Sequence, residues 1–273
     1  MTTACDLHTH STASDGQYTP AQLVKLAGLA GIQVLALTDH DTLEGLEEAF
    51  QAGAAAGLRV IAGIELSAKE YDTFHILGYC FRADAPELQS LCCRMKRRRD
   101  ERNPRLLAFL RRQGVNLSED EIRELSGGDV IGRPHFARAM VRRGYVRSSR
   151  EAFDRYLDTE EYHQQVERDK PTVQECIETI KASGGKTVLA HPYQIGLENE
   201  ALDRLVGKLV SAYGLDGMEC FYPKHTPAQT AFYLSLAQKH RIHVTGGSDF
   251  HGKLVKPDVN LMPWRLDIRW LLE

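Results

Sequence analysis

Side chains that can bind metal ions follow short apolar runs at six separate places in this chain of 273 residues. The runs have the length and β-branched composition of strands, as in Val60–Ile64 directly before Glu65. In barrels of alternating strands and helices, functional side chains gather at the carboxyl ends of the strands. The pattern therefore predicts an α/β barrel with one polar site. The candidate ligands are His8, His10, Asp15, His40, Glu65, His75, His191, Asp249 and His251.

The first pair of histidines shows why the set matters more than any one member. Residues 4–10 read as a short strand, and side chains two apart on a strand point to the same face, so His8 and His10 could hold one ion. Alone, this spacing is weak evidence, because two histidines on one strand face are often just exposed polar residues. That explanation would have to hold at all six places, so a shared metal site is the better interpretation.

The alternation of strands and helices is interrupted once. Strands are predicted at 4–8, 33–37, 58–66, 73–81, 186–190, 217–220 and 242–245. Helices are predicted after a Thr19-Pro20 start and after a cap at Thr42, then at 173–182, 199–213 and 227–240. Little between residues 86 and 170 resembles a strand; helical patterns cover 85–113, 118–125, 134–143 and 149–157. We therefore expect a barrel formed by residues 1–84 and 171–273, with a helical cap inserted at 85–170.

Composition narrows the setting of the protein. No apolar run approaches the length of a membrane span, and the N-terminus lacks a charged segment followed by an apolar one. The six cysteines contain no Cys-x-x-Cys pair, so we expect free thiols and a cytoplasmic protein without membrane contact. The net charge of −3 gives no global case for a stable nucleic-acid complex. The oligomeric state does not follow from the sequence.

These motifs resemble those of the polymerase and histidinol phosphatase (PHP) domain, a family of metal-dependent phosphoesterases. The matching segments are Asp6-Leu7-His8-Thr9-His10, Ser14-Asp15-Gly16, Leu37-Thr38-Asp39-His40-Asp41, Gly63-Ile64-Glu65, His75, Ala190-His191-Pro192 and Gly247-Ser248-Asp249-Phe250-His251. They occur in the family's order over nearly the whole chain. The resemblance implies a distorted (β/α)7 TIM-like barrel with a helical cap. Within the family, the chain is most similar to the nucleotide 3′,5′-bisphosphate phosphatase and RNase AM group.

The candidate ligands are too many for one ion, because zinc takes about four and magnesium about six. The resemblance implies three ions. It assigns the first to His8, His10, Glu65 and Asp249, the second to Glu65, His75 and His191, and the third to Asp15, His40 and His251. The count of ligands fits two to three divalent ions. A site rich in both imidazole and carboxylate favours Mn²⁺, with Zn²⁺ or Fe²⁺ also possible. Asp39, Asp41 and Glu219 are candidates to orient the ligating histidines, although Asp41 could equally be a helix-start carboxylate.

Two basic segments could bind phosphate. Arg133 and His135 lie at a predicted helix start, where backbone N–H groups favour anions. Related nucleotide phosphatases carry the same Arg-x-His-Phe-Ala pattern, so we assign both residues to substrate phosphate; the alternative is a surface helix cap. The basic run at 94–105 could contact RNA, but such runs are more often a solvated helix face. The chain departs from these relatives at 162–165 and 193–195, which predicts that an anion-binding lysine and arginine are lost there.

We therefore expect an enzyme that hydrolyses phosphate esters of nucleotides, most of all 3′,5′-bisphosphonucleotides, by attack of a metal-bridging hydroxide. His135 or a metal-bound water would protonate the leaving group. The alternatives are a 5′-to-3′ exoribonuclease on short RNAs, a histidinol-phosphatase-like phosphomonoesterase, an amidohydrolase, and a non-catalytic metal-binding module.

Overall fold

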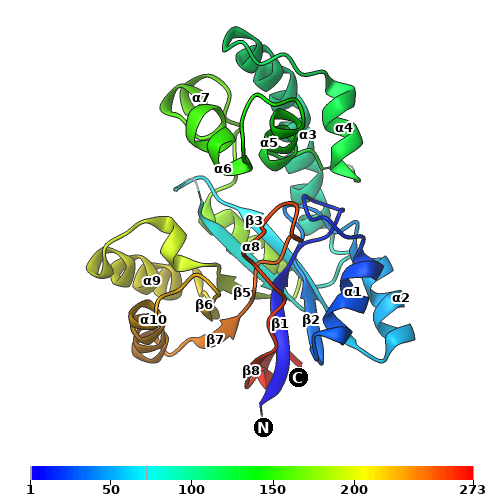
Figure 1. The fold of residues 1–273 in the computed structure, drawn as a ribbon. Helices are drawn as coiled ribbons and strands as arrows, with labels where there is room; N and C mark the ends of the chain where they lie inside the picture. Colours follow the sequence, from blue (N-terminus) through cyan, green and yellow to red (C-terminus); the bar gives the residue numbers. More distant parts are fainter. Residues whose placement is uncertain (1, 72, 129, 273) are drawn as a thin grey trace.

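A computed structural model describes residues 2–71, 73–128 and 130–272, and its strands form one sheet that nearly closes into a barrel (Figure 1). The strand order is β7-β6-β5-β4-β3-β2-β1-β8. The strands are β1 (Thr3–Thr9), β2 (Val34–Leu37), β3 (Arg59–Ser67), β4 (His75–Tyr79), β5 (Lys186–Leu189), β6 (Gly217–Phe221), β7 (His243–Gly246) and β8 (Trp264–Leu266). The segment after β7 returns to β1, where the Asp249 N–H donates to the His8 carbonyl at 2.7 Å. The predicted α/β barrel is confirmed, with β8 as an additional strand.

The barrel is distorted because β4 runs antiparallel to both of its neighbours. The chain passes from β3 to β4 through a short loop, which is too short for the helical crossover that a parallel pair requires. The remaining pairs are parallel, except that β8 runs antiparallel to β1. Parallel strands on both sides of β4 therefore bring their carboxyl ends to one end of the barrel.

Helices pack around the barrel and over one of its ends. Around the barrel lie α1 (Pro20–Leu29), α2 (Leu46–Ala56), α8 (Val173–Ala182), α9 (Asn199–Tyr213) and α10 (Pro227–His240), and a short α11 (Arg269–Leu272) ends the described chain. The cap contains α3 (Pro86–Arg112), α4 (Glu119–Ser126), α5 (Arg133–Arg142), α6 (Ser149–Ala152), the short π-helix η1 (Phe153–Leu157) and α7 (Glu160–Gln165). Figure 1 shows the cap at the end of the barrel away from both termini. No helix in the described ranges is long and apolar enough to cross a membrane.

The helix starts follow the sequence at α1 and differ from it at α2. Thr19 accepts a hydrogen bond from the Gln22 N–H in a capping box, as expected for a Thr-Pro start. The predicted cap at Thr42 is wrong, because α2 begins only at Leu46, after Gly45. Asp41 has a φ of 56°, so the chain turns sharply just before Thr42, and the Thr42 hydroxyl accepts the Glu44 N–H at 3.3 Å in the turn that precedes the helix.

The cap has its own apolar cluster. Leu106, Phe109, Phe136, Met140 and Tyr162 are all buried in it, whereas the helices around the barrel pack on a separate, larger cluster. A segment with its own core can fold around it and hold a fixed shape. The division of the chain at residues 84/85 and 170/171 stays a prediction.

Asp41 joins the cap to the barrel. Its carboxylate accepts hydrogen bonds from the Ser67 N–H at 2.9 Å, from Arg168 at 2.8 Å and from Arg99. Burial opposes ionisation, but the two guanidinium groups outweigh it and hold the pKa of Asp41 well below its usual range. Asp41 is therefore neither a helix-start carboxylate nor a partner of a histidine ring. It fixes one residue of α3 and one residue after α7 against the strand end of β3.

Replacing Asp41 should loosen the cap. Asp41→Asn leaves two buried arginines without their carboxylate, and breaking a buried ion pair costs about 3–5 kcal/mol. Denaturant unfolding at neutral pH should report a free energy of unfolding lower by that amount. Glu101→Gln, which removes a surface carboxylate that pairs with Arg97 and Arg98, should cost less than about 1 kcal/mol. Equal losses in the two variants would contradict the role of Asp41.

Candidate metal centre

A bulge in β1 aims its two histidines into the barrel. The pairing of β1 with β2 shifts register between Asp6 and Thr9, and such bulges re-aim side chains. Leu7 packs in an apolar cluster with residues of the neighbouring strands. On the other face of the strand, His8 and His10 both point to Glu65. Their Nε2 atoms are 3.3 and 3.2 Å from its Oε2. The two imidazoles share one target, as their spacing predicted.

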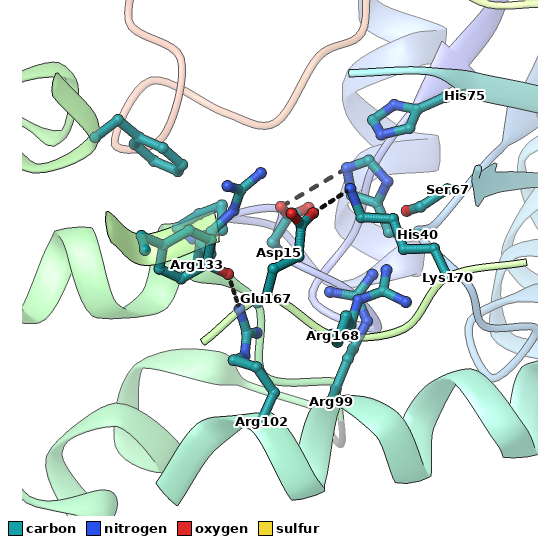
Figure 2. A pocket seen from close by; sticks show the side chains of 14 residues that line it. Asp15, His40, Ser67, His75, Arg99, Arg102, Arg133, Glu167, Arg168 and Lys170 are labelled. Carbon is teal, nitrogen blue, oxygen red and sulfur yellow. Dashed lines mark hydrogen bonds and ion pairs between the residues drawn. The ribbon is translucent and has the colours of Figure 1, made fainter. Parts of the chain in front are cut away.

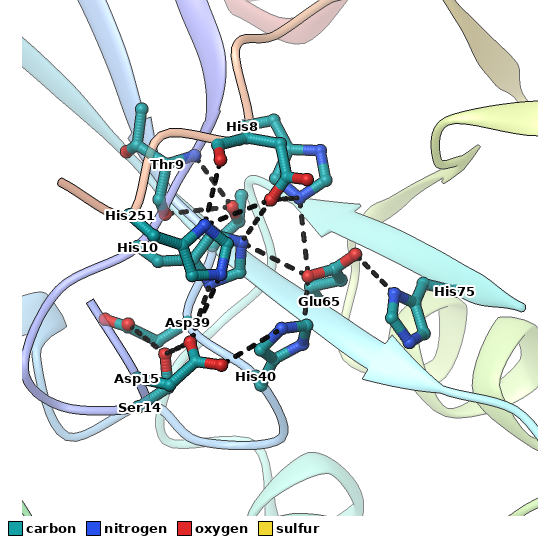
Figure 3. Close-up of polar contacts among 12 residues, drawn as sticks. His8, Thr9, His10, Ser14, Asp15, Asp39, His40, Glu65, His75 and His251 are labelled. Carbon is teal, nitrogen blue, oxygen red and sulfur yellow. Dashed lines mark hydrogen bonds and ion pairs between the residues drawn. The ribbon is translucent and has the colours of Figure 1, made fainter. Parts of the chain in front are cut away.

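The Glu65 carboxylate lies at the centre of the site (Figure 3). Its Oε2 is 2.9 Å from His40 Nδ1, and its Oε1 is 2.7 Å from His75 Nδ1 and 2.9 Å from His191 Nε2. Burial opposes ionisation of Glu65, but the surrounding histidines outweigh it and keep its pKa well below the usual range. Five predicted ligands from four separate segments thus converge on one carboxylate.

Asp15 and His251 form the adjoining part of the site. Asp15 Oδ1 is 3.2 Å from His251 Nε2, and Asp15 Oδ2 is 3.8 Å from His40 Nε2. Asp39 was predicted to orient a ligating histidine, but among the described residues no hydrogen bond or ion pair joins it to a histidine ring. It accepts hydrogen bonds from the hydroxyls of Ser11 and Ser14, both at 2.6 Å, and so holds the loop that carries Asp15.

Asp249 is held from two sides. Its Oδ1 lies 3.6 Å from His8 Nε2 and 3.3 Å from His10 Nε2. Its Oδ2 accepts hydrogen bonds from the Tyr222 hydroxyl at 2.8 Å and from the Lys256 ammonium. This grip leaves Oδ1 facing the histidines. Sequence reasoning did not identify Tyr222 or Lys256, because neither occurs in a ligand motif.

Glu219 contacts two of the candidate ligands, a position that fits its predicted orienting role. Its carboxylate accepts a hydrogen bond from the backbone N–H of His191 at 2.8 Å and lies 3.2 Å from His8 Nδ1. His191 has a φ of 23°, a strained value that the surrounding structure must enforce. A Cβ on Gly247 would lie 2.2 Å from the His8 Cβ and 2.7 Å from Glu219 Oε1, so only glycine fits beside this pair.

The donor set fits divalent metal ions. Four overlapping groups of three or four ligand atoms lie within 4.8 Å of one another, and together they include all nine predicted ligands. Several of these buried atoms, among them His8 Nε2, both ring nitrogens of His10 and Glu65 Oε2, find no hydrogen-bond partner among the residues that the structure describes. Burial lowers the pKa of His75 and of His251 to about 4, so both are neutral near pH 7, the form that binds metal. The structure brings the nine together, while their individual roles stay predictions.

A cavity of about 140 Å³ opens beside the cluster and carries positive charge from the cap. Asp15, His40 and His75 form its floor (Figure 2). Its cationic lining residues are Arg99, Arg102, Arg133, Arg168 and Lys170. The expectation of a wholly solvated basic helix face is therefore wrong for α3, because Arg99 and Arg102 are only 8% and 2% exposed. Arg94, Arg97 and Arg98 of the same run do pair with surface carboxylates.

Arg102 is a buried cation whose named partners are all neutral. It donates to the Asn103 side chain at 3.0 Å, the Tyr162 hydroxyl at 3.0 Å and the Ile131 carbonyl at 3.3 Å. Among the described residues, no carboxylate lies within ion-pair distance of it. Burial lowers the pKa of Arg102 only to about 10, so it stays charged near pH 7. Such a charge is costly without an anion nearby.

Arg133 and His135 lie at the start of α5, as predicted, while their binding of substrate phosphate stays a prediction. Arg133 lines the cavity and donates to the Leu157 carbonyl and to Asp158 Oδ1, both at 3.1 Å. His135 is buried, and its Nδ1 accepts the Gly132 N–H at 2.9 Å at the start of α5. Burial lowers the pKa of His135 to about 4, so the neutral ring carries its proton on Nε2. That Nε2 has no hydrogen-bond partner in the described structure.

The chain is similar in sequence and structure to known phosphate-ester hydrolases. The PHP domain model matches residues 6–186. The chain is 35% identical to a 5′-3′ exoribonuclease of Haemophilus influenzae, which covers 92% of this chain and 91% of the relative. It is 34% identical to a phosphoribosyl 1,2-cyclic phosphate 1,2-diphosphodiesterase of Eggerthella lenta (91% and 94%), and 31% identical to a 3′,5′-nucleoside bisphosphate phosphatase of Chromobacterium violaceum (90% and 86%). A solved structure of a candidate metal-dependent phosphoesterase from Bifidobacterium adolescentis superimposes with a TM-score of 0.85 at 31% identity, covering 98% of this chain and 95% of the other.

Proposed function

The chain belongs to the PHP domain family of metal-dependent phosphoesterases, and we propose that it acts on nucleotides that carry a terminal phosphate. One observation carries the proposal: a buried, cation-lined cavity opens directly beside the ligand cluster. The cluster supplies the place for the reacting phosphorus, and the cavity supplies charge for a second phosphate.

We propose that the nine ligands hold two to three divalent ions, with Mn²⁺ preferred, in the three sets that the family resemblance implied. Glu65 supports a bridging role, because its two oxygens face different histidines. When bound, such ions lower the pKa of water and neutralise phosphoryl oxygens. Tyr222 and Lys256 keep Asp249 aimed at the cluster, and Glu219 does the same for His8 and His191.

The cavity residues have separate tasks. Arg102 and Arg133 provide guanidinium N–H donors for phosphate oxygens, the geometry in which arginine binds most strongly. Arg99 and Arg168 are partly neutralised by Asp41, Lys170 is 2.7 Å from Glu167, and Arg133 is 3.1 Å from Asp158, so the charge of these four is shared. His135 directly follows the lining residue Pro134, and its neutral N–H suits hydrogen bonding to substrate better than proton donation.

A 3′,5′-bisphosphonucleotide matches this arrangement, with one phosphate in the cavity and the other at the cluster. Trimming of short RNAs from a 5′-phosphate is the second candidate. Its support is the similarity to a 5′-3′ exoribonuclease and a further basic opening at the cluster, formed by residues that include His251 and Lys256. Both reactions would use the same ligands and differ in which phosphate lies over them.

Metal content tests the ligand sets. Protein purified with manganese should contain about two to three ions per chain by elemental analysis. His8→Ala and Asp249→Asn should abolish turnover while circular dichroism stays unchanged, since each removes a ligand without opening the apolar cores. A metal content of one or below, or near-wild-type rates in either variant, would rule out the multinuclear assignment.

The cavity arginines should matter for nucleotides and little for small esters. Arg102→Met and Arg133→Ala each remove a charge-assisted contact worth about 1.5–3 kcal/mol, so kcat/KM for a bisphosphonucleotide should fall by about 10- to 150-fold. An aryl phosphate without a second phosphate should lose less. Arg97→Ala, an exposed position on the same helix, is the control. Equal losses on both substrates would refute phosphate binding in the cavity.

Comparing the hydrolysis rates of two substrates distinguishes the two candidate activities. We expect adenosine 3′,5′-bisphosphate to release inorganic phosphate faster than a 5′-phosphorylated short RNA releases mononucleotides, since the cavity and the cluster together fit two phosphates of one nucleotide. Phosphate assays and chromatography of the products measure the two rates. Efficient release of mononucleotides, with the bisphosphate a poor substrate, would select the exoribonuclease instead.

A further inference from the structure

A second opening of the candidate metal centre adjoins the cavity that Arg102 lines, and the two share Asp15, His40, Pro134 and Phe153. This passage is also lined by His251 and Lys256. It shares Ser149, Val255 and Lys256 with a larger groove of about 800 Å³. The groove, here called the outer groove, runs between the cap residues 138–150 and the loop at 253–259 that follows β7.

The outer groove is strongly basic. Its cations are Arg138, Arg142, Arg150, Lys224, Lys253 and Lys256, and Asp258 is the one carboxylate among the described residues that line it. The whole chain has a net charge of −3, so this excess is local. Two sides contribute to it, because the arginines come from the cap and the lysines from the barrel loops.

Part of this charge is not compensated. Arg142 pairs with Glu124 at 2.9 Å, Arg150 with Asp154 at 3.7 Å, and Lys256 with Asp249. For Arg138, Lys224 and Lys253, the described ranges offer no carboxylate within 4.0 Å. Lys224 and Lys253 are exposed, and Lys253 donates to the Pro257 carbonyl at 2.7 Å. A groove with uncompensated cations on both walls favours a ligand with repeated negative charges.

We propose that the outer groove binds the sugar-phosphate backbone of a single-stranded nucleic acid whose terminal nucleotide lies in the metal centre. This proposal rests on the proposed function, since it takes the reacting phosphate to lie at the Glu65 cluster. The continuity of passage and groove favours a strand over an acidic protein: the occupant of the groove must also reach the reaction centre. The terminal phosphate would enter the cavity beneath Arg102, and the remaining strand would leave through the passage.

The lining also fixes the kind of recognition. Phe153 is the one aromatic residue among the described residues of passage and groove, so successive bases find no stacking platform. Binding would therefore depend on backbone charge, tolerate any sequence and weaken with salt. For single strands, the logarithm of affinity falls with the logarithm of salt concentration by about 0.7 for each phosphate contacted.

Charge reversal at the exposed lysines separates the groove from the catalytic site. The test variant is Lys224→Glu/Lys253→Glu. The control is Arg204→Glu/Lys208→Glu, which changes net charge equally at exposed positions on α9. Substrates are adenosine 3′,5′-bisphosphate and 5′-phosphorylated ten-nucleotide RNA and DNA strands. We expect KM for the ten-mers to rise about tenfold or more in the test variant alone, with bisphosphate kinetics unchanged and the salt slope lower by about 1.4.

Binding to an inactive protein distinguishes failure of this proposal from failure of the proposed function. In a His8→Ala background, fluorescence anisotropy should show that the ten-mers bind and that the two lysine substitutions weaken binding at least tenfold. Tighter binding of the RNA ten-mer than of the DNA ten-mer would assign the groove to RNA, and equal binding would assign it to either strand. Unchanged binding in the lysine variant, or equal loss in the α9 control, would overturn the groove even if the bisphosphate is hydrolysed. Absence of all hydrolysis with groove-dependent binding intact would overturn the proposed function alone.

Discussion

The rest of the structure depends on one buried carboxylate, that of Glu65, which is in contact with five imidazoles. A carboxylate out of water is costly unless positive charge and hydrogen-bond donors surround it. The barrel meets this requirement by bringing strand ends from distant parts of the chain to one point. The bulge in β1, the strained backbone at His191 and the close approach at Gly247 all serve that convergence. A divalent ion at this site would relieve the remaining cost, because the candidate ligands could offer it their ring nitrogens and carboxylate oxygens.

The cap supplies what the barrel lacks. The barrel end presents carboxylates and imidazoles, whereas the cap presents guanidinium groups, and the cavity lies between them. Asp41 connects the two parts, because its carboxylate accepts hydrogen bonds from Arg99 and Arg168. Arg102 is different, since the groups that accept its hydrogen bonds are neutral and leave its charge uncompensated. In the proposed function, this charge is available to a substrate phosphate.

Much of this could be read from the sequence, and the reason is physical. His8 and Glu65 lie near the carboxyl ends of β1 and β3, and Asp249 follows β7. Strand polarity in an α/β barrel dictates that such ends meet. Family resemblance then gave the fold. The sequence could not show where isolated cations point. Arg99 and Arg102 looked like members of a solvated helix face, since helical periodicity alone does not say which face the barrel covers.

Other misses have the same origin in tertiary contacts. Thr42 resembled a helix cap, but the chain turns in the left-handed region at Asp41, and α2 begins only at Leu46. Asp39 resembled a partner of histidine, but hydroxyls of the Asp15 loop are closer to it. Tyr222 and Lys256 belong to loops without a motif, and only the folded chain brings them to Asp249.

The central claim is that Glu65 organises a multinuclear metal centre. Anomalous diffraction at the manganese edge, from crystals of manganese-loaded protein, tests it most directly. The account predicts at least two peaks that share the Glu65 carboxylate, one beside His8 and His10 and another beside His75 and His191. A single peak, or peaks that do not contact Glu65, would contradict it.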